Sequence, residues 1–208
     1  APKAFFVVVS VVYLLPRLIH LDALPVFLDE LFHIRLATYT LQGDLLAGSY
    51  EGKWFAIKLM ALSLLLPMHP VIAVRIGSVF VGYAILIVLF LFSSYLPSPK
   101  VGYAAALLYA ITPYSLFYDR LALTDGYLAL VFITFLLVSV YLARSEPAFW
   151  KIVLVMSLSS ICVLTKLSGI AFVLTPLVII PFFAVDRIYN RLVYYAVPSF
   201  LAGAGVFA

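Results

Sequence analysis

Long apolar segments separated by short polar breaks organise this chain. The apolar runs are Phe5 to Leu21, Val71 to Leu96, Val101 to Phe117, Gly126 to Ala143 and a longer tract from Ile152 to Val185. A helix that spans a membrane needs about 20 mostly apolar residues, and several runs reach that length. The longest tract is expected to cross twice, turning near Thr165-Lys166-Leu167-Ser168-Gly169. The pattern predicts an all-α membrane protein with about seven transmembrane helices.

Residues 22–70, between the first two runs, predict a long external loop that carries two membrane-surface helices. In the first, Glu30 to Leu46, leucine and isoleucine positions fall near one face, and Glu30, His33 and Gln42 fall nearer another. The second, Trp54 to Leu66, is apolar but too short to span by itself, so we expect it to lie in the interface. A spanning interpretation of Trp54 to Leu66 is the alternative.

We expect residues 1–208 to form one transmembrane module. Residues 1–21 hold the first helix, residues 22–70 the external loop, and residues 71–208 about six further helices, the last incomplete. The chain begins at Ala1 without a methionine and stops inside an apolar run, so we expect it to be the N-terminal part of a longer protein.

Composition and charge agree with a membrane protein. Hydrophobic residues make up 66% of the chain, charged residues 11%, and the mean hydropathy is +1.19, values that exclude an ordinary soluble domain. One cysteine, Cys162, rules out a disulfide framework. We expect membrane lipids and other membrane proteins as partners, and no nucleic acid.

Basic residues in the short breaks set the expected orientation. Pro97 to Lys100, Arg144 to Lys151 and Asp186 to Arg191 carry Lys and Arg, and the positive-inside rule puts all three breaks, Arg187 included, on the cytoplasmic side. The intervening polar segments, with Arg120 and Lys166, then face the extracytoplasmic side.

Three charged clusters interrupt the apolar pattern: Leu28-Asp29-Glu30, Tyr50-Glu51-Gly52-Lys53 and Tyr118-Asp119-Arg120-Leu121-Ala122-Leu123-Thr124-Asp125. Ionisable groups near hydrocarbon are costly, so those that persist are candidates for a functional site. In order and spacing, these clusters and the Thr165-Lys166 turn resemble the GT-C membrane glycosyltransferases, in particular the protein O-mannosyltransferase and aminoarabinose-lipid A transferase groups. Members of these groups usually run to more than twice this length.

The resemblance implies inverting transfer of a sugar from a polyprenyl-phosphate donor to an extracytoplasmic acceptor, at the plasma membrane or the endoplasmic reticulum. It implies that the Asp29-Glu30 pair is catalytic, with Asp29 as the general base. The donor phosphate would be held by Arg120, Lys53 and Lys166. Glu51 matches a family glutamate near a divalent-metal site, which His33 would join.

Each residue also has a structural interpretation. Asp29 would cap the helix that begins at Glu30, and Asp125 would mainly cap the next span. Arg120 would snorkel to the interface, and Arg17 and Arg75 have no predicted role. Two other functions stay open: a non-catalytic GT-C-like subunit of a larger complex, and a transporter, which we favour less because the charges gather near one surface instead of at mid-membrane.

Overall fold

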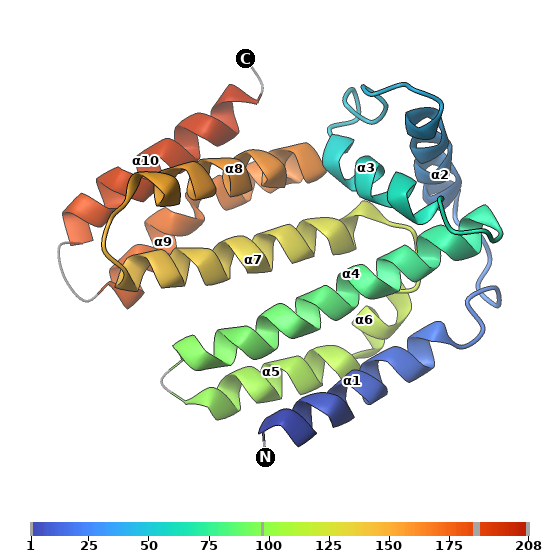
Figure 1. Cartoon of the computed structure of the whole chain (residues 1–208), viewed down its shortest axis with the longest axis horizontal. Coiled ribbons are helices and arrows are strands. Elements are labelled where there is room, and N and C mark those ends of the chain that lie inside the picture. The colour runs from blue at the N-terminus through green and yellow to red at the C-terminus, as the bar shows by residue number, and fades with distance from the viewer. Residues whose placement is uncertain (1, 97, 185–187, 207–208) are drawn as a thin grey trace.

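The computed structural model describes residues 2–96, 98–184 and 188–206, and these residues form helices and turns without a strand. Figure 1 shows the helices packed into one bundle. In chain order the elements are α1 (Pro2–Leu18), α2 (Leu28–Leu41), α3 (Trp54–Ser63), α4 (Pro70–Phe92), η1 (Ser93–Tyr95), α5 (Pro99–Ile111), α6 (Pro113–Tyr118), α7 (Thr124–Arg144), α8 (Phe149–Thr165), η2 (Leu167–Leu174), α9 (Thr175–Phe183) and α10 (Ile188–Gly205). The all-α prediction is confirmed for the described residues.

The long helices lie side by side, with α4 and α7 at the centre. Helix α4 packs against α1, α5 and α7, and α7 packs on its other side against α8 and α9. Helices α2 and α3 lie together at the right of Figure 1. We call this the α2–α3 end, and it comprises residues 19–69, 119–125 and 165–168. The opposite end comprises residues 93–96, 98–100 and 144–149.

Two stretches of the described residues, Pro70–Tyr95 and Thr124–Arg144, are long and apolar enough to cross a membrane by length and composition. About seven transmembrane helices were expected, and the described residues support two of them. Breaks shorten the other runs. Pro113 starts a new helix inside the third run, and Lys166 separates α8 from η2. Helices α1 and α8 have 17 residues each, or about 26 Å against a hydrocarbon core of about 30 Å.

Several predicted boundaries are confirmed. Helix α3 begins at Trp54, and the long C-terminal tract turns where α8 ends at Thr165 and η2 begins at Leu167. Helix α2 ends at Leu41, a few residues earlier than predicted. Gly43 follows with a φ of 103°, a conformation that glycine adopts without a Cβ penalty.

The buried face of α2 follows the amphipathic pattern of its sequence only in part. The face buried in the protein carries Glu30 and His33 beside Ile34 and Ala37, whereas Leu31 is 51% exposed. The two polar side chains point inward because α4 and the segment before α7 supply hydrogen-bond partners for them. Buried polar groups are tolerated when they are paired in this way.

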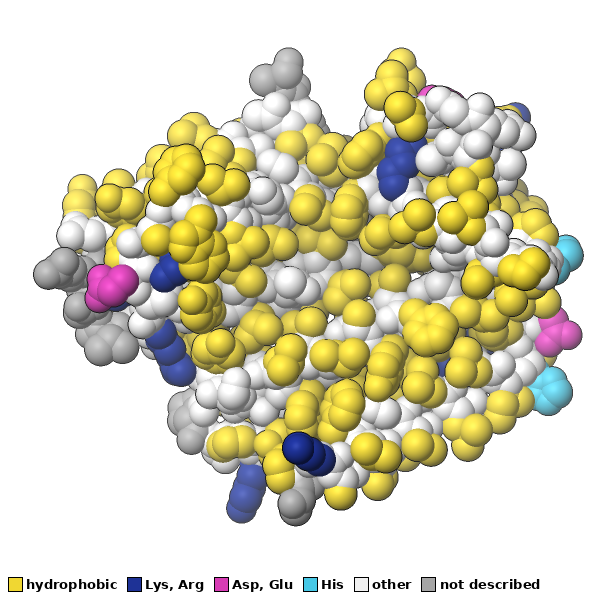
Figure 2. Space-filling model, viewed as in Figure 1, with side chains coloured by type: hydrophobic (Ala, Val, Ile, Leu, Met, Phe, Trp, Pro, Cys, Tyr) yellow, Lys and Arg dark blue, Asp and Glu magenta, His cyan; other side chains and the backbone are white. Residues whose placement is uncertain are grey.

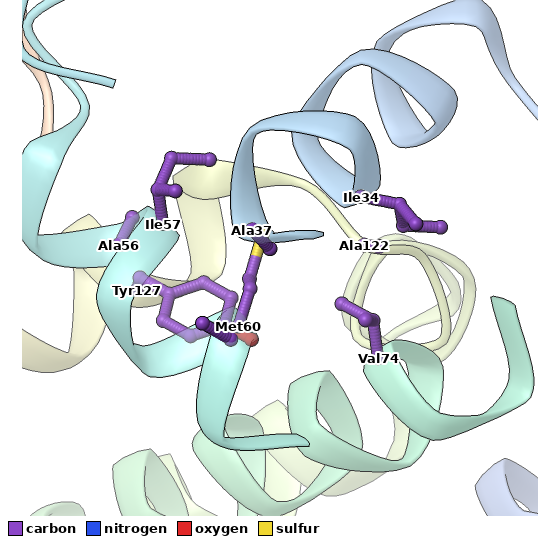
Figure 3. Packing of buried hydrophobic residues seen from close by; sticks show 9 residues of the cluster. Ile34, Ala37, Ala56, Ile57, Met60, Val74, Ala122 and Tyr127 are labelled. Carbon is purple, nitrogen blue, oxygen red and sulfur yellow. The ribbon is translucent and has the colours of Figure 1, made fainter. Parts of the chain in front are cut away.

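An apolar cluster fixes the two loop helices on the bundle. Ile34 and Ala37 of α2, Met60 of α3 and Val74 of α4 meet Tyr127 of α7 (Figure 3). Ile57 and Ala56 of α3 belong to the same cluster. Truncation of a buried side chain of this size costs about 2–5 kcal/mol. Helices α2 and α3 are therefore part of the folded core.

Candidate functional site

A buried ion pair holds the start of α2 against α4. Glu30 Oε2 lies 2.7 Å from Arg75 Nη2, Glu30 Oε1 accepts from Arg75 Nε at 2.9 Å, and both side chains are almost fully buried. The backbone N–H groups of Ala122 and Phe27 donate to the same carboxylate at 2.9 and 3.1 Å. Burial alone would raise the pKa of Glu30, but the Arg75 and backbone hydrogen bonds oppose it, and the net pKa falls below its ordinary value.

Arg75 also donates hydrogen bonds to the backbone that precedes α2. Nη1 donates to the carbonyls of Leu21 and Leu24 at 2.6 and 3.0 Å, and Nη2 donates to that of Pro25 at 3.0 Å. One guanidinium therefore ties residues 21–30 to α4. No role was predicted for Arg75 from the sequence, although an arginine inside an apolar run indicates a buried partner. In this arrangement Glu30 is a positioning group, because both of its oxygens are engaged.

Asp29 lies in the first turn of α2 and is exposed. The N-cap residue of α2 is Phe27, whose N–H is bound by Glu30, so the interpretation of Asp29 as the cap is wrong. No hydrogen bond within the described residues engages the Asp29 carboxylate. A carboxylate beside a rigidly held turn, and open to solvent, can accept a proton from a bound ligand.

His33 lies one turn after Asp29 and links three segments. Its Nδ1–H donates to the Ala122 carbonyl at 2.9 Å, and Lys53 Nζ donates to its Nε2 at 3.1 Å, an arrangement that requires neutral imidazole. Burial lowers the pKa of His33, and the Lys53 charge adds to this effect, while Asp29 and Asp125 act in the opposite direction. The charges of these two carboxylates and of Lys53 therefore all act on the His33 imidazole.

Lys166 and Asp125 close the other side of this group. Lys166 Nζ lies 2.6 Å from Asp125 Oδ1, and the side chains are 30% and 62% exposed. Asp125 is not the cap of α7, because Leu123 holds that position and no side-chain bond caps the helix. Gly52, with a φ of 63°, packs on Leu167 and brings the turn before α3 beside Lys166.

Two predicted site residues face elsewhere. Arg120 Nη2 donates to the carbonyls of Ile19 and His20 at 3.0 and 2.6 Å, just beyond the end of α1. Glu51 is exposed and borders a separate cavity of about 380 Å³ with Trp54 and Leu167. The structure brings Asp29, His33, Lys53, Asp125 and Lys166 together, and Arg120 and Glu51 lie at the margins of that group.

The predicted metal ligands do not fit an ion in this arrangement. Both ring nitrogens of His33 are already hydrogen-bonded, to the Ala122 carbonyl and to Lys53 Nζ. Among the described residues, no three His, Cys, Asp or Glu side chains lie close enough to hold a metal ion. The divalent-metal site at Glu51 and His33 stays a prediction from the resemblance alone.

A second buried ion pair was missed from the sequence. Arg17 Nε lies 3.1 Å from Asp119 Oδ2, and Tyr13 and Tyr109 donate their hydroxyls to the same carboxylate at 2.9 and 3.1 Å. Arg17 also donates to Ser115 Oγ at 3.0 Å. The pair joins α1 to α5 and α6. The available signal was Arg17 itself, a charge within the first apolar run.

Comparison of this chain with family models, with curated proteins and with solved structures finds no match. The function is therefore inferred from the residues of the chain and from their arrangement at the α2–α3 end.

Proposed function

We propose that this chain is a multi-pass membrane glycosyltransferase of the GT-C type, which moves a sugar from a polyprenyl-phosphate donor to an extracytoplasmic acceptor with inversion. One observation carries the proposal. Four segments distant in sequence meet here: Lys53 is bonded to His33, whose imidazole also feels the charges of Asp29 and Asp125, and Lys166 is bonded to Asp125. A base and two ammonium groups at one surface are what phosphate-leaving glycosyl transfer requires.

The apolar exterior supports the membrane part of the proposal. In Figure 2, apolar side chains cover the middle of the visible face, and most of the visible charged side chains lie toward its margins. On α1, Val7, Val8 and Leu15 are each 59–60% exposed, and on α10 Leu201 is 62% exposed. Exposed apolar surface of this extent is typical of a membrane or protein contact. Helices just under the usual spanning length would tilt little or thin the bilayer locally.

The distribution of charge supports the proposed orientation. Lys100 and Arg144 are exposed at the opposite end, and Lys151 lies in the first turn of α8 beside them. By the positive-inside rule this end faces the cytoplasm, which gives the α2–α3 end to the extracytoplasmic side. Arg187, the other basic residue expected there, lies outside the described residues.

In the proposed reaction Asp29 accepts the proton of the acceptor hydroxyl. The acceptor oxygen forms a bond to the anomeric carbon while the bond from that carbon to the lipid phosphate oxygen breaks, with inversion. The phosphate leaves as a stabilised anion without protonation, so one carboxylate suffices for proton transfer. Glu30 contributes by fixing the first turn of α2, and thus Asp29, against α4.

Lys53 is the leading phosphate ligand in this proposal. Its ammonium is oriented by His33 and half-buried near Asp29, where it acts as a point charge toward phosphate oxygens. Lys166 would join it after release from Asp125, and an exposed ion pair of this kind costs only about 0–1 kcal/mol to break. Arg120 would have to leave the Ile19 and His20 carbonyls first.

The test is Asp29→Asn, assayed with a radiolabelled polyprenyl-phosphate hexose and an acceptor lysate. We expect transfer to fall by at least about a hundredfold, because a positioned base contributes about 10²–10⁴-fold. Thermal stability and donor binding should stay at the wild-type level, since Asp29 caps nothing. Asp22→Asn, an exposed aspartate at the same end, is the matched control and should transfer normally. Normal transfer by Asp29→Asn would refute the assignment.

A non-catalytic membrane subunit is the second candidate. Arg120 and Lys166, two of the three proposed phosphate ligands, are engaged inside the chain, which favours a structural use of these charges. If wild-type protein transfers no sugar from any polyprenyl-phosphate donor and Asp29→Asn leaves its membrane complexes intact, this candidate replaces the enzyme.

A further inference from the structure

A cavity of about 210 Å³ lies between α4, α5, α6 and α7, behind the Asp125–Lys166 bridge. Its polar lining comes mainly from three tyrosines, Tyr109, Tyr114 and Tyr118, and two carboxylates, Asp119 and Asp125. The glycosyl-transfer proposal uses neither the tyrosines nor Asp119. The cavity is mostly apolar with a few convergent polar groups, which is the usual character of a small-ligand site.

Both carboxylates keep acceptor capacity that could face a ligand. Asp119 Oδ2 accepts from Tyr13 and Arg17, whereas Oδ1 accepts from Tyr109 alone. Asp125 bonds Lys166 through Oδ1, and no described residue donates to its Oδ2. Because each carboxylate oxygen can accept two hydrogen bonds, the pair can take further donors from a ligand.

The aromatic lining favours a positive charge. Tyr114 and Tyr118 place their ring centroids 4.3 Å apart at the mouth, where they are 67% and 41% exposed, and Tyr109 lines the cavity as well. The faces of aromatic rings attract cations. The residues that line the cavity include no Lys, Arg or His, and the cations that pair with its carboxylates, Arg17 and Lys166, lie outside that lining. The lining itself thus presents carboxylate oxygens and aromatic rings to the cavity, and no basic side chain.

We propose that this cavity binds a primary organic ammonium group. The Lys166–Asp125 bridge already shows one carboxylate of the lining bound to an ammonium, at 2.6 Å. A ligand ammonium would take the place of Lys166 at Asp125, with its methylene groups against Tyr118. Lys166 is then a built-in competitor for the site. The inference shares Asp125 and Lys166 with the glycosyl-transfer proposal but does not rest on it, since it concerns binding alone.

The test is isothermal titration of the full chain in dodecyl maltoside with ethanolamine, which is protonated at pH 7. Asp125→Asn and Tyr118→Leu should each weaken binding by about tenfold, the equivalent of one cation contact. Lys166→Met should tighten binding, because it frees Asp125 from its internal partner. Asp22→Asn and Tyr189→Leu are matched controls, one aspartate and one tyrosine exposed outside the cavity, and should bind as wild type does.

A neutral ligand of similar size distinguishes binding of a cation from nonspecific binding in an apolar cavity. 1-Propanol has a similar size without the charge, and we expect it to bind at least about tenfold more weakly than ethanolamine. The proposal is overturned if ethanolamine does not bind, if 1-propanol binds equally well, or if Lys166→Met weakens ethanolamine binding.

The source of the ammonium is tested in nanodiscs. A lipid headgroup source predicts that phosphatidylethanolamine discs abolish the ethanolamine signal, whereas phosphatidylglycerol discs preserve it. A free-amine source predicts the same signal in both discs. Either pattern supports the ammonium site and identifies its ligand, and loss of the signal in both discs counts against it.

Discussion

Glu30 and Arg75 lie 45 positions apart in the chain and meet through a 2.7 Å contact between Oε2 and Nη2 with almost no solvent exposure. The pair joins the start of α2 to α4, and Arg75 also holds three backbone carbonyls of residues 21–25. The position of Asp29, the neighbour of Glu30, depends on this contact. Stability and site geometry are therefore coupled at the first turn of α2.

Removal of one partner of this pair should destabilise the protein strongly. We expect Glu30→Gln and Arg75→Met each to lower the free energy of unfolding by about 3–5 kcal/mol, because each leaves a buried group without its counter-charge. Thermal unfolding in detergent is the measurement. The double variant should lose less than the sum of the two single variants. Additive losses would show that the two side chains act separately.

Acidification should destabilise the α2–α3 end through His33. Its folded pKa lies below the ordinary value of 6.5, so the unfolded chain binds more protons than the folded one in this range. The stabilisation from neutral His33 is complete above about pH 6.5 and is lost as the pH falls toward the lower folded pKa. Glu30, whose pKa is also lowered, adds its loss only below its own ordinary value of 4.5.

We therefore expect the melting temperature to fall between pH 7.5 and pH 5.5, by about 2–4 °C for each kcal/mol lost. His33→Gln retains a hydrogen-bonding side chain that does not titrate, and its melting temperature should change less over this interval. Equal slopes for His33→Gln and wild type would remove His33 as the cause.

Arg120 should behave as a structural residue when the donor is absent. Its guanidinium binds the Ile19 and His20 carbonyls, so Arg120→Met should lower the free energy of unfolding by about 1.5–3 kcal/mol. Arg120→Lys should recover part of that loss, since an ammonium can reach a carbonyl but lacks the planar fork. Thermal unfolding without donor measures both. If stability is unchanged and only donor affinity falls, Arg120 is a phosphate ligand.

The proposed topology predicts opposite labelling of the two ends. In a Cys162→Ala background, Glu51→Cys should react with an impermeant maleimide added to intact cells, and Lys100→Cys should react only after lysis. Glu51 and Lys100 are both exposed in the structure, so protein burial does not explain a difference between them. Labelling of position 100 from outside would reverse the orientation and remove the proposed active face.

Part of the candidate site was predicted because its signals are local. The breaks at residues 28–30, 50–53, 119–125 and 165–168 stand out in an apolar sequence, and the structure gathers them at one end of the bundle. Alternation of helix direction along a chain of long helices produces this grouping. The start of α3 at Trp54 and the break after Thr165 also follow from local sequence.

By itself, the sequence determined that the chain is helical and apolar and that most of its charges lie at the breaks, because those properties depend on residue type and spacing. Tertiary structure decided which charges pair. Glu30 was expected in catalysis and is buried against Arg75, while Asp29, one residue away, is open to solvent. Successive side chains on a helix point about 100° apart, so Asp29 and Glu30 face different directions. Partners contributed by α4 and by the segment before α7 determine which of the two carboxylates is enclosed and which remains accessible.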